Sequence, residues 1–199
     1  MSDETIARAL ESDAPLTAAV GQRDVAHEVA EERGWREAAL AARTVTINRP
    51  RAELYAFWRD FRNLALFMEN IESVTPGDDR RSHWVVKAPA GKTVEWDSVL
   101  VEEVENELLA WETVEGSGLR NAGRIEFRDG PPGRGTEVTA TIVYEPPGGE
   151  LGKLVAKLFQ KEPKIQARRE LRRFKQLMET GEIPVAFKED DSAVRGSFS

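Results

Sequence analysis

The alternation of apolar and polar residues between positions 43 and 181 predicts one strand, a helical region, a run of strands and a long final helix. RTVTINRP (43–50) alternates with a period of two, which is typical of a strand with one buried face. Pro50 then suits the first turn of a helix, where its missing N–H would have no intrahelical partner. Apolar residues follow at helical spacing, namely Leu54, Phe57, Trp58 and Phe61, with a second short helix predicted around Leu64, Phe67 and Met68.

Six further segments have the pattern of strands: ENIESVTP, SHWVVKAP, TVEWDSVLVEEVEN, LLAWETVEG, AGRIEFRDG and GTEVTATIVYEP. In the last five, alternation gives one mostly apolar face, which collects Trp84, Val86, Trp96, Ser98, Leu100, Leu109, Trp111, Thr113, Ile125, Phe127, Val138, Ala140, Ile142 and Tyr144. The other face collects polar residues: His83, Lys87, Glu95, Asp97, Glu112, Arg124, Glu126, Arg128, Glu137, Thr139 and Thr141. This pattern is typical of an antiparallel sheet that is covered on one side.

The chain after the Pro-Pro-Gly-Gly turn predicts the final helix. Two apolar stripes occur at helical spacing: Leu151, Leu154, Val155, Leu158 and Phe159, and then Ala167, Leu171, Phe174 and Met178. Pro163 breaks or kinks the helix between them, and Gly181 is placed to end it. We therefore predict an α+β helix-grip fold, in which a curved antiparallel sheet wraps around a long C-terminal helix and leaves room for a cavity.

Composition and charge narrow the class of protein. The chain has 199 residues, of which 40% are hydrophobic and 32% charged, and it contains no cysteine, which excludes disulfides and thiolate metal sites. No stretch approaches the roughly 20 apolar residues of a membrane span, and MSDETIARALESD lacks the features of a secretory signal, so a cytoplasmic location is expected.

The net charge of −7 is concentrated near the two ends of the sequence. Residues 1–42 carry four basic and nine acidic residues, whereas residues 43–181 carry 22 of each. A neutral body argues against nucleic acid as the partner. We expect residues 1–42 to form an acidic extension that is disordered or loosely helical, residues 43–184 the folded domain, and residues 185–199 a disordered tail.

A resemblance to a known family rests on four segments: VTINRPRAELYAFWRDFRNLALFMENIESV, WDSVLVEEVENELLAWET, GRIEFRDGPPGRGTEVTATIVYEPPGG and LRRFKQLMETGEIP. They resemble the START-like superfamily, also called SRPBCC or Bet v 1-like, and within it the polyketide cyclase/dehydrase group, sometimes labelled coenzyme Q-binding-like. The resemblance covers residues 43–184 and implies the helix-grip fold. It also implies one of three functions. The protein would bind or transport lipids, quinones or polyketides, or it would cyclise polyketides, or it would act as a binding partner of another protein.

Large aromatic residues fall on the face predicted to line the cavity, and they either contact a ligand or fill the core. These residues are Trp84, Trp96, Trp111, Phe127 and Tyr144. On the same face Ser98, Thr113 and Tyr144 are polar, and such groups either orient a ligand oxygen or bond to nearby backbone. Tyr55 and Trp58 face the entrance of the cavity or, as their helical stripe favours, pack on the sheet.

Acid–base and metal chemistry have few candidates in this sequence. The chain has two histidines, His27 in the N-terminal region and His83 on the polar face, so neither a catalytic triad nor a histidine metal site is predicted. No catalytic residue, metal or cofactor is assigned. The outer carboxylates are expected to pair with Arg124 and Arg128 across strands, namely Glu95, Asp97, Glu112 and Glu126.

The pattern as a whole favours a protein that binds a small hydrophobic ligand, such as a lipid, quinone or polyketide-like molecule, between the sheet and the final helix. Two alternatives stay open. One is a polyketide cyclase/dehydrase-type enzyme, which would need a buried acid–base group such as Tyr144. The other is a protein-interaction module that uses the outer sheet face or the basic run KIQARRELRRFK. That run favours a solvated helix face over a membrane surface or another anionic partner.

Overall fold

A computed structural model describes residues 39–182, with the exception of 79, 118, 146–148, 150–152 and 154–162. The described helices are α3 (Arg51–Arg59), the short helices η1 (Phe61–Asn63), α4 (Leu64–Phe67) and η2 (Pro89–Gly91), and α6 (Pro163–Thr180). The described strands are β1 (Ala39–Ile47), β2 (Ile71–Pro76), β3 (Arg81–Ala88), β4 (Lys92–Val104), β5 (Leu108–Thr113), β6 (Arg120–Asp129) and β7 (Thr136–Glu145).

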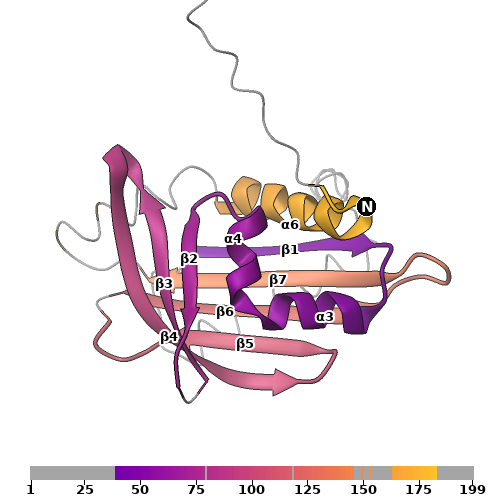
Figure 1. The fold of residues 1–199 in the computed structure, drawn as a ribbon, viewed down its shortest axis with the longest axis horizontal. Coiled ribbons are helices and arrows are strands. Elements are labelled where there is room, and N and C mark those ends of the chain that lie inside the picture. Colours follow the sequence, from indigo (N-terminus) through magenta and orange to yellow (C-terminus); the bar gives the residue numbers. More distant parts are fainter. Residues whose placement is uncertain are drawn as a thin grey trace, which may run out of the picture.

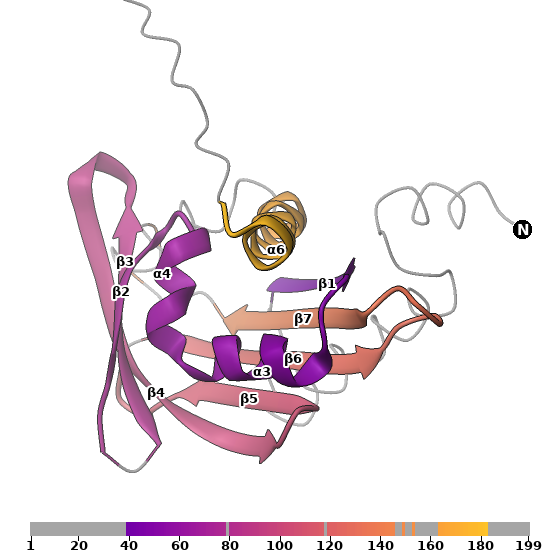
Figure 2. The same cartoon turned by 45° about the vertical axis from the view of Figure 1, so that its right-hand side comes forward.

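These strands form one antiparallel sheet in the order β1-β7-β6-β5-β4-β3-β2. The sheet curves strongly, and α3, α4 and α6 all lie on its concave side (Figures 1 and 2). The predicted α+β helix-grip fold is therefore confirmed. In the described part of the chain, no helix combines the length and hydropathy that crossing a bilayer requires.

The hydrophobic core lies between the concave face of the sheet and the helices. On α6, Leu171 and Phe174 are buried whereas Arg172 is exposed, which confirms the predicted phase of this helix. The helix begins at Pro163 and ends before Gly181, whose φ of 76° is the left-handed conformation expected of a residue that terminates a helix. The predicted stripe from Leu151 to Phe159 lies outside the described residues.

Two sequence-based expectations need correction. Strand β1 begins at Ala39, four residues before the predicted start. The pattern did not reveal these four residues because three of them are alanines and they show little alternation of polar and apolar side chains. The convex face is not uniformly polar either. Thr141 was expected to be solvated but is 2% exposed, and Val143 on the same face is 1% exposed. Residues 1–38 of the extension predicted to be disordered or loosely helical, and the predicted disordered tail 185–199, lie outside the described residues.

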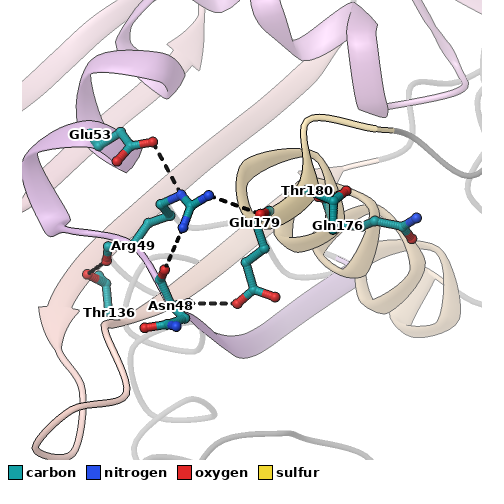
Figure 3. A network of polar contacts seen from close by, with 7 residues as sticks. All are labelled: Asn48, Arg49, Glu53, Thr136, Gln176, Glu179 and Thr180. Atoms are coloured by element: carbon teal, nitrogen blue, oxygen red, sulfur yellow. Dashed lines mark hydrogen bonds and ion pairs between the residues drawn. The ribbon is translucent and has the colours of Figure 1, made fainter.

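Side-chain contacts attach the C-terminal end of α6 to the end of β1 (Figure 3). The Asn48 backbone N–H donates to the Glu179 carboxylate at 2.7 Å, and the Arg49 guanidinium donates to the Glu179 carbonyl at 2.9 Å. Lys175 donates to the carbonyl of Thr46 at 2.7 Å. Later residues of α6 therefore lie beside later residues of β1, and the two elements run in the same direction.

Candidate functional site

A row of polar side chains crosses the concave face from β3 to β7. Ser82 pairs with Ser98, which pairs with Thr113 on β5. The Asn121 backbone N–H on β6 donates to Thr113 Oγ1 at 3.1 Å, and Asn121 pairs with Tyr144 on β7. All of them are buried except Thr113, which is half-buried. These residues form a continuous polar row across the concave face, and we call it the polar row.

Ser98 stands out within the polar row because its hydroxyl lacks a hydrogen bond. The residue is 0% exposed, and its Oγ has no hydrogen-bond partner within the described ranges. An unsatisfied buried hydroxyl costs about 1–3 kcal/mol, so most buried polar groups have a partner. Ser82, its neighbour in the row, is satisfied because its Oγ accepts a bond from Trp84 Nε1 at 2.8 Å.

Three tryptophans pack beside the polar row on β3, β4 and β5. The ring centroid of Trp84 lies 6.1 Å from that of Trp96 and 6.2 Å from that of Trp111, with interplanar angles of 10° and 16°. Phe61 closes this group from the helical side, at 5.7 Å from Trp84 and 5.6 Å from Trp111. A Cβ added to Gly123 would lie 2.2 Å from Trp111 Cζ2, so the glycine makes room for the indole.

A second aromatic group joins α3 and α4 to α6. The ring of Trp58 lies 4.9 Å from Phe174 at an angle of 87°, and 5.4 Å from Phe67. Trp58 is 1% exposed, and its Nε1 is buried without a hydrogen-bond partner among the described residues. Like Ser98 Oγ, this N–H is a buried donor on the concave side that a bound molecule could satisfy.

A charged cluster surrounds Glu103, where α3 meets β4. Tyr55 Oη donates to the Glu103 carboxylate at 2.7 Å, and Arg59 also donates to it, while Arg80 lies 3.5 Å away. Pairing of β4 with β5 shifts between Leu100 and Glu102. Such a bulge re-aims the side chains that follow it, and it brings Glu103 opposite the fully buried Leu109 on the concave face.

The cluster fixes the protonation states of Tyr55 and Glu103. Burial, followed by the Glu103 hydrogen bond and charge, raises the pKa of Tyr55 to about 12. Burial would also raise the pKa of Glu103, but the hydrogen bonds from Arg59 and Tyr55 outweigh it and leave that pKa below its usual range. At neutral pH the pair is therefore a phenol that donates to a carboxylate.

Comparison with known proteins relates this arrangement to a family. The profile of the family described as polyketide cyclase/dehydrase and lipid transport matches residues 38–179. The chain belongs to this family. The predicted resemblance is thus confirmed, and the match spans all the described elements from β1 to nearly the end of α6.

Solved structures related to this cyclase/dehydrase-family protein include the DR_A0006 protein of Deinococcus radiodurans, which is 36% identical with a TM-score of 0.59. That match covers 72% of this chain and 99% of the other. The TTHA0849 protein of Thermus thermophilus is 26% identical with a TM-score of 0.55, and that match covers 69% of this chain and 95% of the other. The Zhui aromatase/cyclase of Streptomyces sp. R1128 has a TM-score of 0.55 over 74% of this chain and 100% of the other; at 12% identity it shows the fold alone.

Among curated proteins, an uncharacterised 17.2 kDa protein of Streptomyces lincolnensis is 29% identical over 84 residues. The alignment covers 42% of this chain and about half, 55%, of that relative.

The structure places the predicted site residues of this family member in three groups on the concave side. Six of them belong to the polar row or the tryptophans beside it: Trp84, Trp96, Trp111, Ser98, Thr113 and Tyr144. Tyr55 packs edge-on against Phe127, with ring centroids 6.0 Å apart, and Trp58 belongs to the second aromatic group. Their contact with a ligand stays a prediction.

The sequence pattern missed Ser82, Asn121 and Glu103. Alternation from Trp84 and from Ile125 would have placed Ser82 and Asn121 on the concave face, but only the strand register aligns them with Ser98. His83 lies on the convex face as predicted, where Nδ1 is 2.8 Å from Asp97. Pairing of the outer carboxylates with arginines across strands was expected, but Glu126 lies 3.0 Å from Arg128 of its own strand, β6, and Asp97 pairs with His83 instead.

Proposed function

We propose that the protein binds a small hydrophobic molecule that carries an oxygen acceptor, such as a lipid, quinone or polyketide-like compound, on the concave face beneath α6. The observation that supports this most directly is the buried Ser98 hydroxyl, which has no partner in the described part of the chain and lies among three tryptophans. A ligand carbonyl or hydroxyl beside Ser98 Oγ would supply the missing acceptor. Membership of a family described as including lipid transport supports the same conclusion.

The energetics of Ser98 favour binding of a ligand with an oxygen over binding of a pure hydrocarbon. A buried hydroxyl without a partner costs about 1–3 kcal/mol, and a ligand acceptor would recover part of this cost. Every 1.4 kcal/mol corresponds to a tenfold change in the dissociation constant. The tryptophans supply apolar contact area for the rest of the ligand, so Ser98 would set orientation and selectivity rather than most of the affinity.

The titratable groups support binding more than catalysis. A general acid or base works best with a pKa near the working pH. Tyr55, with a pKa of about 12, and Glu103, with a lowered pKa, are both held away from that range. Burial also raises the pKa of Tyr144, so its phenol stays protonated at neutral pH. These groups are suited to holding a ligand oxygen or a helix in place.

Two neutral probes test the proposal by fluorescence. N-phenyl-1-naphthylamine, a hydrophobic fluorophore, is titrated into the protein, and menadione, a quinone with two carbonyl oxygens, is used to displace it. We expect saturable binding of both, quenching of tryptophan emission, and little dependence on salt because no charge pair is involved. Trp96→Leu should weaken binding of both probes.

Ser98→Ala separates the role of the hydroxyl from general apolar contact. It should weaken menadione binding by up to about tenfold while leaving the naphthylamine within about twofold. Val101→Ala is the matched control, because Val101 is 41% exposed on β4 and away from the concave face. A folded protein that binds neither probe would refute the proposed function, and equal weakening of both probes by Ser98→Ala would refute the role of the hydroxyl.

A further inference from the structure

The indole of Trp58 is a hydrogen-bond donor that the packing of the concave side buries without an acceptor. The side chain is 1% exposed, and its Nε1 has no hydrogen-bond partner among the residues that the structure describes. An indole nitrogen can only donate, and a buried one usually has a partner because it has lost its contact with water. Trp84 shows the ordinary case, since its Nε1 donates to Ser82 Oγ at 2.8 Å.

The groups packed around the Trp58 indole on the side of α4 and α6 are aromatic rings. Its ring centroid lies 5.4 Å from that of Phe67 at an interplanar angle of 54°, and 4.9 Å from that of Phe174 at 87°. Phenylalanine side chains carry no oxygen or nitrogen that could accept the indole proton. The packing of the helices therefore buries this donor and supplies no acceptor for it.

Contacts on both sides of Trp58 hold α3 in the orientation that leaves the indole unsatisfied. Tyr55 Oη, three residues earlier, donates to the Glu103 carboxylate at 2.7 Å, and Arg59, the next residue, donates to the same carboxylate. Hydrogen bonds to an ionised group are roughly twice as strong as neutral ones. Turning the helix toward an acceptor would break these stronger bonds, so Glu103 is a positioning residue for the Trp58 N–H.

Trp58 and Ser98 belong to adjoining parts of one core, and Phe61 connects them. The ring of Phe61 lies 5.7 Å from Trp84 and 5.6 Å from Trp111, the tryptophans that pack beside the polar row. Phe61 follows Trp58 by three residues, so their Cα atoms are at most about 11 Å apart. All four aromatic residues are members of the same cluster of buried residues. One ligand can therefore contact a donor on the sheet and a donor on a helix.

We propose that Trp58 Nε1 donates a hydrogen bond to the ligand, and that the ligand carries two separate oxygen acceptors, one for Ser98 Oγ and one for Trp58 Nε1. This inference rests on the proposed function, because it assigns a second polar contact to the same bound molecule. The ligand class is then a compact apolar molecule with two carbonyl or hydroxyl oxygens. A lipid with a single polar end would satisfy only one of the two donors.

Partly buried side chains next to Trp58 can make room for such a molecule. Met68 directly follows Phe67, and Met178 lies one helical turn after Phe174; both methionines pack against the core cluster without being fully buried. Methionine is unbranched and changes its conformation easily, so it adapts to molecules of different shape. A ligand that displaces these two side chains would reach the indole from the side of α4 and α6.

Indole ¹⁵N–¹H correlation spectra test the donor role on the unsubstituted protein. The chain has five tryptophans. Loss of a signal in Trp58→Phe and in Trp84→Phe identifies two of them, and nuclear Overhauser contacts to the Phe174 ring assign Trp58 independently. Without ligand, the Trp58 N–H proton should resonate upfield of the hydrogen-bonded Trp84 N–H. Saturating menadione should move the Trp58 signal downfield, whereas 2-methylnaphthalene, which has the same skeleton without the two oxygens, should not.

Displacement of N-phenyl-1-naphthylamine measures the affinities of the same two molecules. Trp58→Phe should weaken menadione binding by about tenfold and 2-methylnaphthalene binding by no more than about threefold. Trp96→Phe is the matched control, because the Trp96 N–H is not one of the buried unpartnered donors in the described part of the chain; it should weaken both molecules equally. Combining Ser98→Ala with Trp58→Phe should weaken menadione by the product of the two single losses, since the donors serve different oxygens.

The possible failures separate this inference from the proposed function. If neither menadione nor 2-methylnaphthalene binds, the proposed function is refuted and this inference with it. If menadione binds but the Trp58 signal does not move downfield, and Trp58→Phe weakens both molecules equally, the donor role of Trp58 is refuted and the proposed function stands. A double variant that binds menadione no more weakly than the weaker single variant would show that one oxygen serves both donors, which would overturn the second acceptor.

Discussion

Replacing Ser98 by alanine should stabilise the ligand-free protein, which is an unusual outcome for a fully buried position. The substitution removes a hydroxyl that has no hydrogen bond among the described residues, and with it a cost of about 1–3 kcal/mol. Loss of the oxygen also removes dispersion contacts worth about 0.1–0.2 kcal/mol each. The net gain should be about 1 kcal/mol, or about 3–5 °C in melting temperature for a domain of this size.

Ser82→Ala is the matched comparison and should have the opposite sign. Ser82 pairs with Ser98 across β3 and β4 and is also buried, but its Oγ accepts the Trp84 indole N–H at 2.8 Å. Its removal leaves that N–H without this acceptor and should destabilise the fold by about 1–3 kcal/mol.

Urea unfolding followed by far-UV circular dichroism measures both variants without relying on the nearby tryptophans. The protein should first be stripped of any bound molecule, because a ligand that contacts Ser98 would stabilise the unsubstituted protein and mask the gain. Saturating menadione should accordingly reduce or reverse the advantage of the Ser98→Ala variant. If both serine variants lose stability equally, the Ser98 hydroxyl already has a partner and the basis for its ligand role is gone.

Three further predictions concern the helix, the charged cluster and the packing of Trp111. Phe174→Ala should lower the free energy of unfolding by about 3–5 kcal/mol, whereas exposed Arg172→Ala should change it by less than about 0.5 kcal/mol in urea titrations; similar losses would contradict the phase of α6. The lowered pKa of Glu103 should stabilise the protein relative to Glu103→Gln at pH 7, and this advantage should disappear as the pH falls below about 4, since protonation removes it; a constant difference down to pH 3 would refute the pKa direction. Gly123→Ala should destabilise the fold by about 1–3 kcal/mol because its Cβ would meet the Trp111 indole, and Trp111→Leu should relieve much of that loss in the double variant, as a double-mutant cycle would detect.

The alternation of the sequence is sufficient to predict which residues face the helices, but not how they line up across strands. Ser98, Thr113 and Tyr144 were placed on the concave face from their spacing alone, and their neighbours across the sheet could not be identified because a single sequence does not determine strand register. The register adds Ser82 and Asn121 and turns separate polar residues into one row.

Bulges and coverage are the other features that alternation does not reveal. The shift in pairing after Leu100 brings Glu103 to the concave face, whereas strict alternation from Leu100 would have placed Glu102 there. The burial of Val143 was equally unforeseen, since a period of two indicates the face of a side chain and not whether another segment lies above that face.

The contacts between α6 and the end of β1 also bear on self-association. A strand at the border of a sheet exposes backbone groups that can recruit a strand from another molecule and start aggregation. On β1, Lys175 occupies the Thr46 carbonyl, and just past the strand Glu179 occupies the Asn48 N–H. The opposite border, β2, is short, irregular between Ile71 and Ser73, and ends in Pro76, which has no N–H to offer. The later residues of β1 and the strand β2 are thus poor templates for an incoming strand, which limits polymerisation through these parts of the sheet border.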